Sequence, residues 1–227
     1  MIAATQLLHL LQFASPSLPI GAYSYSQGLE AALEHGIVKD APSAQAWIAR
    51  HLHEVVARWE APLCWRLMQA FTQRDGQRVA ELSERAIASR DTAEFRAETV
   101  QMGYSLARLI GELGIADEGA LAILQADAEV PLASAYACAV AALGIPHEEA
   151  LLALLFSWAE NQVLVCVKSV PLGQVAGQRL LLALRPEIEA AALCAQALAE
   201  HELSNWTPAL SMLSMRHEVQ YSRVYRS

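Results

Sequence analysis

Apolar residues recur along most of the chain at the spacing of an amphipathic helix. The clearest example occupies positions i, i+3, i+4 and i+7 of one helix face and consists of Leu106, Leu109, Ile110 and Leu113. No alternating run of polar and apolar residues is long enough to predict a β-sheet. The pattern therefore predicts an all-α fold, arranged as a single-domain multi-helix bundle.

The same periodicity predicts a series of helices joined at prolines and glycines. The helices cover residues 5–13, 26–34, 43–74, 77–88, 91–114, 120–128, 132–143, 148–169, 174–184 and 186–202. The expected joints are Pro42, Gly76, 144–146, Pro171 and Pro186. Pro62 is expected to kink or break the third helix, because proline lacks an N–H and clashes with the preceding turn. Asp91, with Glu94 three residues later, is expected to cap the helix that ends near Gly114.

Two segments depart from this rhythm. Residues 15–25, SPSLPIGAYSY, contain two prolines, a glycine and several hydroxyl groups, which predicts an ordered non-helical loop. The helical pattern stops after Leu203, and we expect the end of the chain to have few buried contacts. The predicted organisation is a helical domain over residues 1–213, followed by a C-terminal interaction tail over residues 214–227.

The composition indicates that another chain covers part of this protein's apolar surface. Hydrophobic residues make up 54% of the 227 residues and charged residues only 18%, and the mean hydropathy is +0.24. The hydrophobic content is enough to bury a substantial core in one large domain. A monomer with so few charged residues would leave apolar surface in contact with water, so we expect a homodimer, or a chain that aggregates without its partners.

The net charge of −8 argues against nucleic acid or an anionic membrane as a partner, because both attract clustered Lys and Arg. The opening residues lack the basic region of a signal peptide. Residues 150–167 form the most apolar stretch, but Glu160, Asn161 and Gln162 interrupt it near its middle. Such a polar triplet is costly in lipid, so the stretch is predicted to be a buried core helix in a soluble, cytoplasmic protein.

No catalytic or nucleotide-binding arrangement stands out. The chain has no GxxxxGK[ST] loop, no GxGxxG after a strand and no GxSxG elbow. Ser24 and Ser26 are expected to cap or order the loop. Gly173 and Gly177 form a GxxxG pattern, which on a helix favours close packing over phosphate binding.

The histidines and cysteines do not have the spacing of a metal-binding site either. Among the seven histidines, His51 and His53 are two residues apart and so lie on different flanks of a helix. His217 is next to Glu218 in the tail, and the others are isolated: His9, His35, His147 and His201. Solvated or hydrogen-bonded structural histidines are expected, although transient nickel contact by the tail stays open. The four cysteines form no CxxC pair and are expected to be reduced core thiols: Cys64, Cys138, Cys166 and Cys194. We therefore expect no catalytic residue, no metal site and no cofactor of the chain's own.

Four ordered blocks resemble one protein family. They are SPSLPIGAYSYSQGLE (15–30), EFRAETVQMGYSL (94–106), VPLGQVAGQ (170–178) and HEVQYSRVYRS (217–227). Together they are similar to the UreF family of urease accessory proteins and span essentially the whole chain. Two departures are small: Ala22 stands where many members have a second glycine, and VYRS replaces the commoner LFRS.

This resemblance implies an all-α dimeric adaptor required for nickel insertion into urease. It would bridge UreD (called UreH in some organisms) and the GTPase UreG on the urease apoprotein. Nickel would be handled by the complex, and GTP would be bound by UreG rather than by this chain. Polar signature residues in non-helical or terminal segments agree with an interaction role.

The resemblance also points to partner-binding residues in the four blocks and next to them. They are Tyr23, Ser24, Gln27, Glu30, Arg96, Glu98, Gln101, Lys168, Gln174, Tyr221, Arg223, Tyr225 and Arg226. Capping and loop hydrogen bonds explain the first four equally well, and a polar network explains the next three. Lys168 at a helix end is favourable to the helix dipole whatever its function. In the tail, arginine and tyrosine are preferred interface residues.

Two other functions stay open. The chain would be a GTPase-activating factor if it supplied an arginine finger to UreG, with Arg96, Arg179 or Arg223 as candidates. It would be a ligand-binding bundle or an unrecognised enzyme if it held one deep pocket with convergent polar groups.

Overall fold

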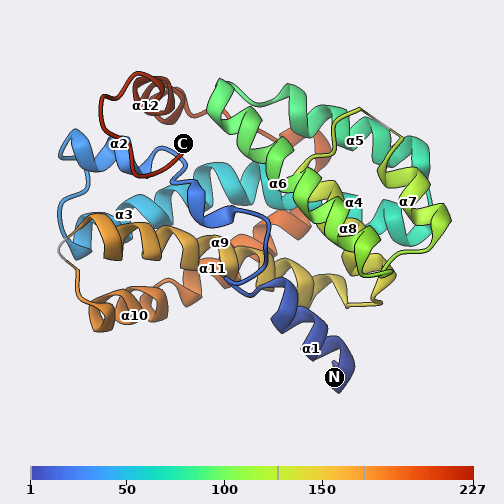
Figure 1. Ribbon diagram of the computed structural model, residues 1–227. Helices are drawn as coiled ribbons and strands as arrows, with labels where there is room; N and C mark the ends of the chain where they lie inside the picture. The colour runs from blue at the N-terminus through green and yellow to red at the C-terminus, as the bar shows by residue number, and fades with distance from the viewer. Residues whose placement is uncertain (1, 127, 171) are drawn as a thin grey trace.

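Helices account for all the regular secondary structure in the parts of the chain that the computed structural model describes, residues 2–126, 128–170 and 172–227 (Figure 1). The α-helices are α1 Ala4–Phe13, α2 Leu29–Glu34, α3 Ala41–His51, α4 Ala61–Gln73, α5 Gly76–Ala88, α6 Ala93–Glu112, α7 Glu118–Leu124, α8 Leu132–Ala142, α9 His147–Ser169, α10 Gln174–Ala183, α11 Arg185–Ala197 and α12 Pro208–Glu218. Short 3-10 turns, η1 Ala22–Ser24 and η3 Glu200–Glu202, and a π-helical stretch, η2 Leu52–Glu60, complete the fold. The predicted all-α class is confirmed.

The core forms where the central helices cross. α4 packs along α8, α6 crosses α8, and α9 and α11 pack against each other and against α4. Fully buried side chains from each helix fill the space between them, among them Leu67, Met68, Leu106, Ile110 and Leu155. Each such side chain contributes roughly 1.5–3 kcal/mol through burial, so these contacts hold the bundle together.

Pro62 does not break the helix; it lies just after the point where the π-helical stretch changes to the α-helix α4. The predicted helix over residues 43–74 is divided into α3, the π-helical stretch and α4, with Pro62 in the first turn of α4. In a continuous α-helix the Arg58 carbonyl would have no donor, because proline has no N–H. Here that carbonyl accepts from the backbone N–H of Ser204 at 3.2 Å. The proline is therefore accommodated without a sharp break.

The start of α6 corrects one prediction. Thr92, not Asp91, is the N-cap residue, and its hydroxyl accepts from the backbone N–H of Phe95 at 3.2 Å. Asp91 instead accepts a hydrogen bond from the Ser211 hydroxyl at 2.8 Å. Threonine is also among the favoured N-cap residues, and its use here leaves Asp91 free to bind α12.

Other helix ends differ from prediction by a few residues. α2 begins only at Leu29, because Gly28 before it has a φ of 80° and cannot continue a helix. α11 ends at Ala197, well before residue 202. Pro171 and part of the predicted 120–128 helix lie outside the described residues. The predicted close packing of the Gly173–Gly177 pair is confirmed only for Gly177, where a Cβ would meet Val167 at 2.5 Å. Gly173 is the N-cap residue of α10 and has nothing within 4 Å of a Cβ, so its part of the prediction is wrong.

The C-terminal part corrects a larger prediction, because α12 continues the helical structure beyond Leu203. Its buried face holds Leu210, Leu213, Ser214 and His217 at the i, i+3, i+4, i+7 spacing. Two of these residues are polar, so the apolar pattern did not reveal the helix. The predicted division between residues 213 and 214 falls inside α12. The expectation of few buried contacts is also wrong, since Tyr225 and Ser227 are buried.

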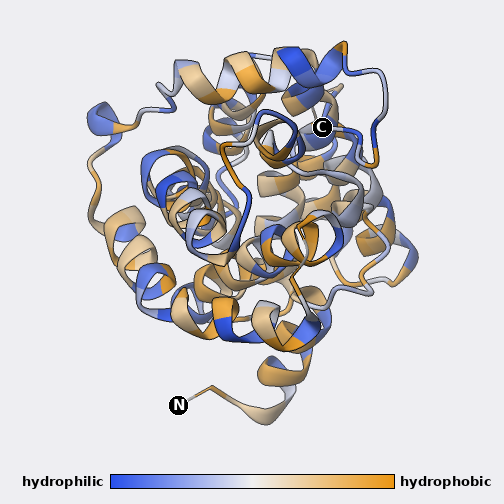
Figure 2. Ribbon diagram, turned by 90° about the vertical axis from the view of Figure 1, so that its left-hand side faces the viewer, coloured by the Kyte–Doolittle hydropathy of each residue, from blue (hydrophilic) through white to orange (hydrophobic). Residues whose placement is uncertain are grey.

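α1 projects from the body of the molecule in both views (Figures 1 and 2). Only Phe13, at its end, is buried, and Leu10 is half-buried against the core. Leu7, Leu8 and Leu11 face outward, with Leu8 67% exposed. Hydrophobic side chains gathered on one projecting helix are typical of a surface that another chain covers.

α9 is long and apolar enough to cross a membrane by length and composition, with a mean hydropathy of 1.7 over its most apolar window. In this fold it packs against α2, α4, α10 and α11. Gln162 within its polar triplet is fully buried. These contacts agree with the predicted core helix.

Candidate functional site

Three of the four motif blocks meet at one place in the fold. The loop of residues 15–28 leads into α2, the second block lies on α6, and residues 219–227, here the C-terminal segment, fold back beside α2 (Figure 1). The hydrogen bonds that join them connect residues 71 to 201 positions apart in the sequence. The fold thus places side by side three motif blocks that are far apart in the sequence.

His217 lies at the centre of this meeting point, between two carboxylates. Its Nδ1 is 2.9 Å from Oε1 of Glu94, and its Nε2 is 3.0 Å from Oε2 of Glu30. His217 is fully buried, and both glutamates are nearly so. Glu30 and Glu94 stand in the first turns of α2 and α6, and His217 in the last turn of α12. Each charge is therefore placed at the helix end whose dipole favours it.

Glu30 also anchors the backbone of the C-terminal segment. Its two carboxylate oxygens accept from the N–H groups of Val224 at 2.7 Å and Tyr225 at 2.9 Å. Next to it, the Arg226 N–H donates to the Ser24 carbonyl at 2.6 Å, and the Ser26 N–H donates to the Ser227 carbonyl at 2.8 Å. The loop and α2 thus supply hydrogen-bond partners for a segment that has no regular structure of its own.

Gln27 joins the loop to three other elements. Its side-chain amide donates to Oε1 of Glu98 at 2.6 Å, and its carbonyl oxygen accepts from the Trp158 indole at 2.6 Å. The other oxygen of Glu98 accepts from the Ser227 hydroxyl at 3.2 Å. Gln27 holds a φ of 53°, in the left-handed region that a side chain disfavours, so these bonds maintain a strained backbone position. Burial raises the pKa of Glu98 to about 7.

Aromatic residues extend the contacts toward the surface. The Tyr25 hydroxyl donates to Oε1 of Gln101 at 2.6 Å, and Arg226 reaches the same oxygen at 3.4 Å. The Lys168 ammonium lies 5.9 Å from the centre of the Tyr225 ring, a cation–π contact. Lys168 lies on α9, just before the third block, and this contact connects α9 to the C-terminal segment.

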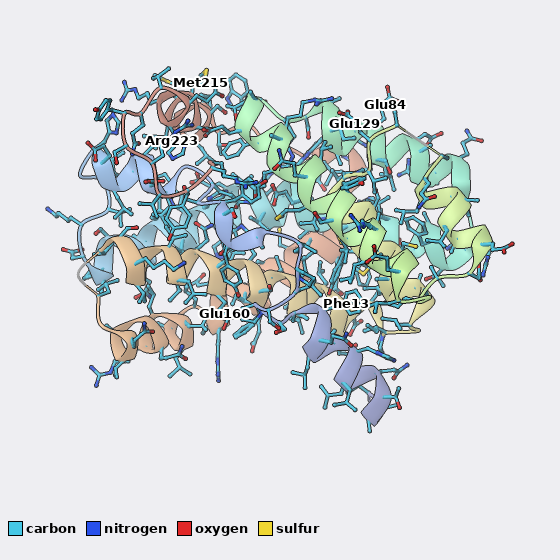
Figure 3. All side chains as sticks on the ribbon, viewed as in Figure 1. Phe13, Glu84, Glu129, Glu160, Met215 and Arg223 are labelled. Carbon is cyan, nitrogen blue, oxygen red and sulfur yellow. The ribbon has the colours of Figure 1, made fainter. Side chains whose placement is uncertain are left out.

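The outer side of this region is exposed and carries positive and aromatic groups. Tyr221, Arg223 and Arg226 of the C-terminal segment face solvent, as does Lys168. Arg223 contacts Glu94 at 3.3 Å but keeps its side chain 43% exposed beside α12 (Figure 3). A surface groove of about 480 Å³ runs between α6 and the segment, lined in part by Tyr25, Gln101, Arg223 and Arg226. We call the exposed side chains of Lys168, Gln101, Tyr221, Arg223 and Arg226 the outer surface.

The structure does not bring every predicted residue here. Arg96 points to Glu129, with which it forms an exposed ion pair. Gln174 is exposed in the first turn of α10, and no contact connects it to the region among the described residues. Tyr23 is half-buried, and burial raises its pKa, with Glu160 adding to the effect. Arg179 is exposed on α10.

The structure adds residues that were not among the predicted partner-binding residues. Ser26, Trp158, His217 and Ser227 all take part in the hydrogen bonds described above. The sequence places only Glu218 beside His217, because the partners of its ring lie 123 and 187 positions away. Its position in the fourth block was the one available signal.

The described residues contain no group of three or more His, Cys, Asp and Glu arranged to hold a metal ion. Both ring nitrogens of His217 already face carboxylates. Burial raises the pKa of the Cys64, Cys138 and Cys166 thiols to about 12, as expected of core thiols, whereas Cys194 is half-buried. Burial lowers the pKa of His51 to about 4.

Comparison with known proteins places these features in a family context. The family model described as UreF matches residues 38–185 of this chain. The urease accessory protein UreF of Janthinobacterium sp. (strain Marseille) is 67% identical over 224 residues, which are 99% of this chain and 99% of that protein. The urease accessory protein UreF of Nitrosospira multiformis is 59% identical over 221 residues, 97% of each chain. That of Azoarcus sp. (strain BH72) is 49% identical, covering 97% of this chain and 95% of the relative.

Proposed function

This chain belongs to the UreF family of urease accessory proteins, and we propose that it acts in urease maturation as a non-enzymatic adaptor. In this proposal it bridges UreD (or UreH) and the GTPase UreG on the urease apoprotein, in the cytoplasm. Nickel is handled by the assembled complex and GTP is bound by UreG. The chain itself contributes surfaces that hold the partners in place.

One observation carries this proposal: three motif blocks that are distant in sequence converge on a buried hydrogen-bonded network with an exposed positive and aromatic side. A network that served only packing would not need an outer side rich in Arg and Tyr. These residue types supply large contact area and several donors, and interfaces favour them. The convergence supports a docking surface for another protein.

The buried and exposed residues have different roles in this proposal. Glu30, Gln27 and Glu98 are buried or half-buried and hold the C-terminal segment in position. Glu30 is buried because its carboxylate serves the backbone of that segment. The outer surface makes the contacts with a partner. Changing Glu30 therefore acts indirectly, through the position of the segment.

The experiment is a binding measurement with purified UreG and UreD. Lys168→Ala and Arg226→Ala should each weaken the binding of one partner at least tenfold, because each removes an exposed cation. Arg216→Ala is the matched control, since Arg216 is an exposed cation on α12 outside the outer surface. Circular dichroism and melting temperature should stay unchanged in all three variants. Unchanged affinity of both partners for the two test variants would refute the proposed docking surface.

A further inference from the structure

The C-terminal segment, residues 219–227, lies along one face of α6. Three polar residues of α6 at the i, i+4, i+7 spacing face it: Glu94, Glu98 and Gln101. Their contacts in the segment are, in the same order, Arg223 at 3.3 Å, Ser227 at 3.2 Å and Arg226 at 3.4 Å. The segment therefore covers a polar stripe of a helix whose other side belongs to the core.

Few buried side chains hold the segment in this position. Tyr225 and Ser227 are its only buried residues, whereas Tyr221 and Val224 are largely exposed. Its backbone is held by hydrogen bonds to Glu30 and to the loop before α2, and no helix continues through it. Elements with few buried apolar contacts open at a lower free energy than the core does. The segment can therefore open while the helical bundle stays folded.

Glu98 is the acidic residue that the segment helps to bury. Burial raises the pKa of Glu98 to about 7, and the hydrogen bonds from Gln27 and Ser227, which favour the ionised form, offset only part of this effect. Opening of the segment removes Ser227 and admits water to the Glu98 carboxyl group, so its pKa returns toward the ordinary value of 4.5. The closed segment therefore holds the Glu98 proton more tightly than the open segment does.

Charged and titratable side chains surround Glu98 and the segment from every neighbouring element. They are Tyr25 on the loop, Glu30 on α2, Glu60 on η2, Arg90 before α6, Glu94 on α6, Lys168 on α9, His217 on α12, and Arg223 and Arg226 on the segment. Arg90 attracts the Glu98 carboxylate, but Arg90 is paired with Glu60, which repels it. None of the other cations forms an ion pair with Glu98 within the described residues. An ionised Glu98 under the closed segment therefore has no counterion of its own.

We propose that the C-terminal segment is a proton-linked cover, which closes over α6 while Glu98 is protonated and opens as Glu98 ionises. When the closed state holds an acid in its protonated form, the stabilising contribution is complete at low pH and is lost as pH rises. The segment is therefore closed in mildly acidic solution and opens more often above neutral pH. Because Arg223 and Arg226 belong to the segment, opening also takes apart the outer surface. That consequence, unlike the cover itself, rests on the proposed docking function.

Hydrogen exchange on the full chain measures this opening directly. The backbone N–H groups of Val224 and Tyr225, which donate to Glu30, become exchangeable when the segment opens. Mass spectrometry of the C-terminal peptide gives their exchange rate, and a synthetic peptide of residues 218–227 gives the unprotected rate at the same pH. The ratio of the two, the protection factor, should fall about 30-fold between pH 5.5 and pH 8.5, as expected for a pKa that closure shifts from 4.5 to about 7.

Glu98→Gln keeps the shape of the side chain but removes the group that ionises. Its protection factor should stay constant over this pH range, and at the alkaline end it should exceed that of the parent protein at least tenfold. Glu112→Gln, which removes an exposed carboxylate at the end of the same helix, is the matched control and should show the same fall as the parent. If Glu98→Gln does not fold, Glu98→Met, which also has no titrating group, replaces it.

Three other results would overturn the inference. A fall in protection that persists in Glu98→Gln means that another group, such as His217, takes up the proton. A parent protection factor that is constant with pH means that closure is not linked to protons. If the segment exchanges as slowly as the buried peptide of α8 at every pH, it opens only with the whole fold and is not a cover. None of these measurements involves a partner protein, so failure of the docking surface in the binding experiment is a separate outcome.

Discussion

Nε2 of His217 lies 3.0 Å from a carboxylate oxygen of Glu30, although 187 positions separate the two residues in the sequence. On the opposite side of the ring, Nδ1 faces Glu94. A neutral imidazole has only one N–H donor, and ionised carboxylates only accept. The geometry therefore requires either an imidazolium or a proton on one of the two carboxyl groups. The triad joins α2, α6 and α12 by charge-assisted hydrogen bonds.

Replacing His217 with alanine should lower the free energy of unfolding by about 3–5 kcal/mol. The variant leaves two buried carboxylates close together without the group between them, and breaking a buried ionic cluster has a cost of this size. Urea denaturation followed by circular dichroism measures the change. His201→Ala, an exposed histidine, serves as the control and should stay within about 0.5 kcal/mol of the parent protein. A similar small effect for His217→Ala would show that the triad does not hold α12.

Gly103 in the second motif block should tolerate no side chain. α6 approaches the start of α8 so closely that a Cβ at this position would lie 2.0 Å from the Val130 carbonyl oxygen and 2.7 Å from Leu132 N. Both atoms are backbone, so neither can rotate away. Gly103→Ala is expected to cost more than about 3 kcal/mol, through separation of the two helices.

Gly111 on the same helix gives the matched control for that change. No atom lies within 4 Å of a Cβ there, so Gly111→Ala should stabilise the protein by about 0.5–1 kcal/mol through reduced backbone entropy. Thermal unfolding of both variants provides the measurement. If Gly103→Ala melts like the parent protein, the close approach of α6 and α8 is wrong.

Much of this fold could be predicted because apolar spacing is a local property. The face of α6 with Leu106 and Ile110 was readable from the sequence, and both side chains are fully buried. α12 could not be read in the same way, since Ser214 and His217 occupy half of its buried face. Their burial depends on Thr92, Glu30 and Glu94, which are distant in sequence.

The candidate site, too, could be predicted only in part from the sequence. The motif blocks identified the residues of the region, but not which of them face inward. Nothing in the sequence around Glu30 indicates that its charged side chain is buried, and the burial is explained only by the Val224 and Tyr225 N–H groups beside it. Contacts such as Gln27 with Trp158 connect different helices and have no periodic signature.

Glu98 should make stability depend on pH in the near-neutral range. Burial raises its pKa from 4.5 to about 7, so the folded state holds the proton more tightly than the unfolded state. For a group whose pKa is raised on folding, the stabilising contribution is complete below the unfolded pKa and is lost as pH rises through the folded value. Between about pH 4.5 and pH 7 this contribution should fall by roughly 2–3 kcal/mol.

The matching experiment compares Glu98→Gln with the parent protein across that pH range. The variant should lack this part of the pH dependence, so the difference in unfolding free energy between the two proteins should change steadily and level off above about pH 7.5. Glu112→Gln, an exposed carboxylate at the end of α6, is the control and should leave the profile unchanged. A parent profile identical to that of Glu98→Gln would mean that Glu98 does not titrate in this range.

The projecting helix α1 should form part of a homodimer interface. Leu7, Leu8 and Leu11 are exposed on a helix whose only buried residue is Phe13, and the chain carries few charged residues overall. Leu8→Glu should therefore shift the protein from dimer to monomer, since a charge in an apolar interface loses its hydration without gaining a partner. Multi-angle light scattering at micromolar concentration gives the mass directly.

Leu193→Glu, which places the same charge at an exposed leucine of α11, should remain dimeric. A parent protein that is monomeric under these conditions, or a Leu8→Glu variant that stays dimeric, would exclude α1 from a homodimer interface.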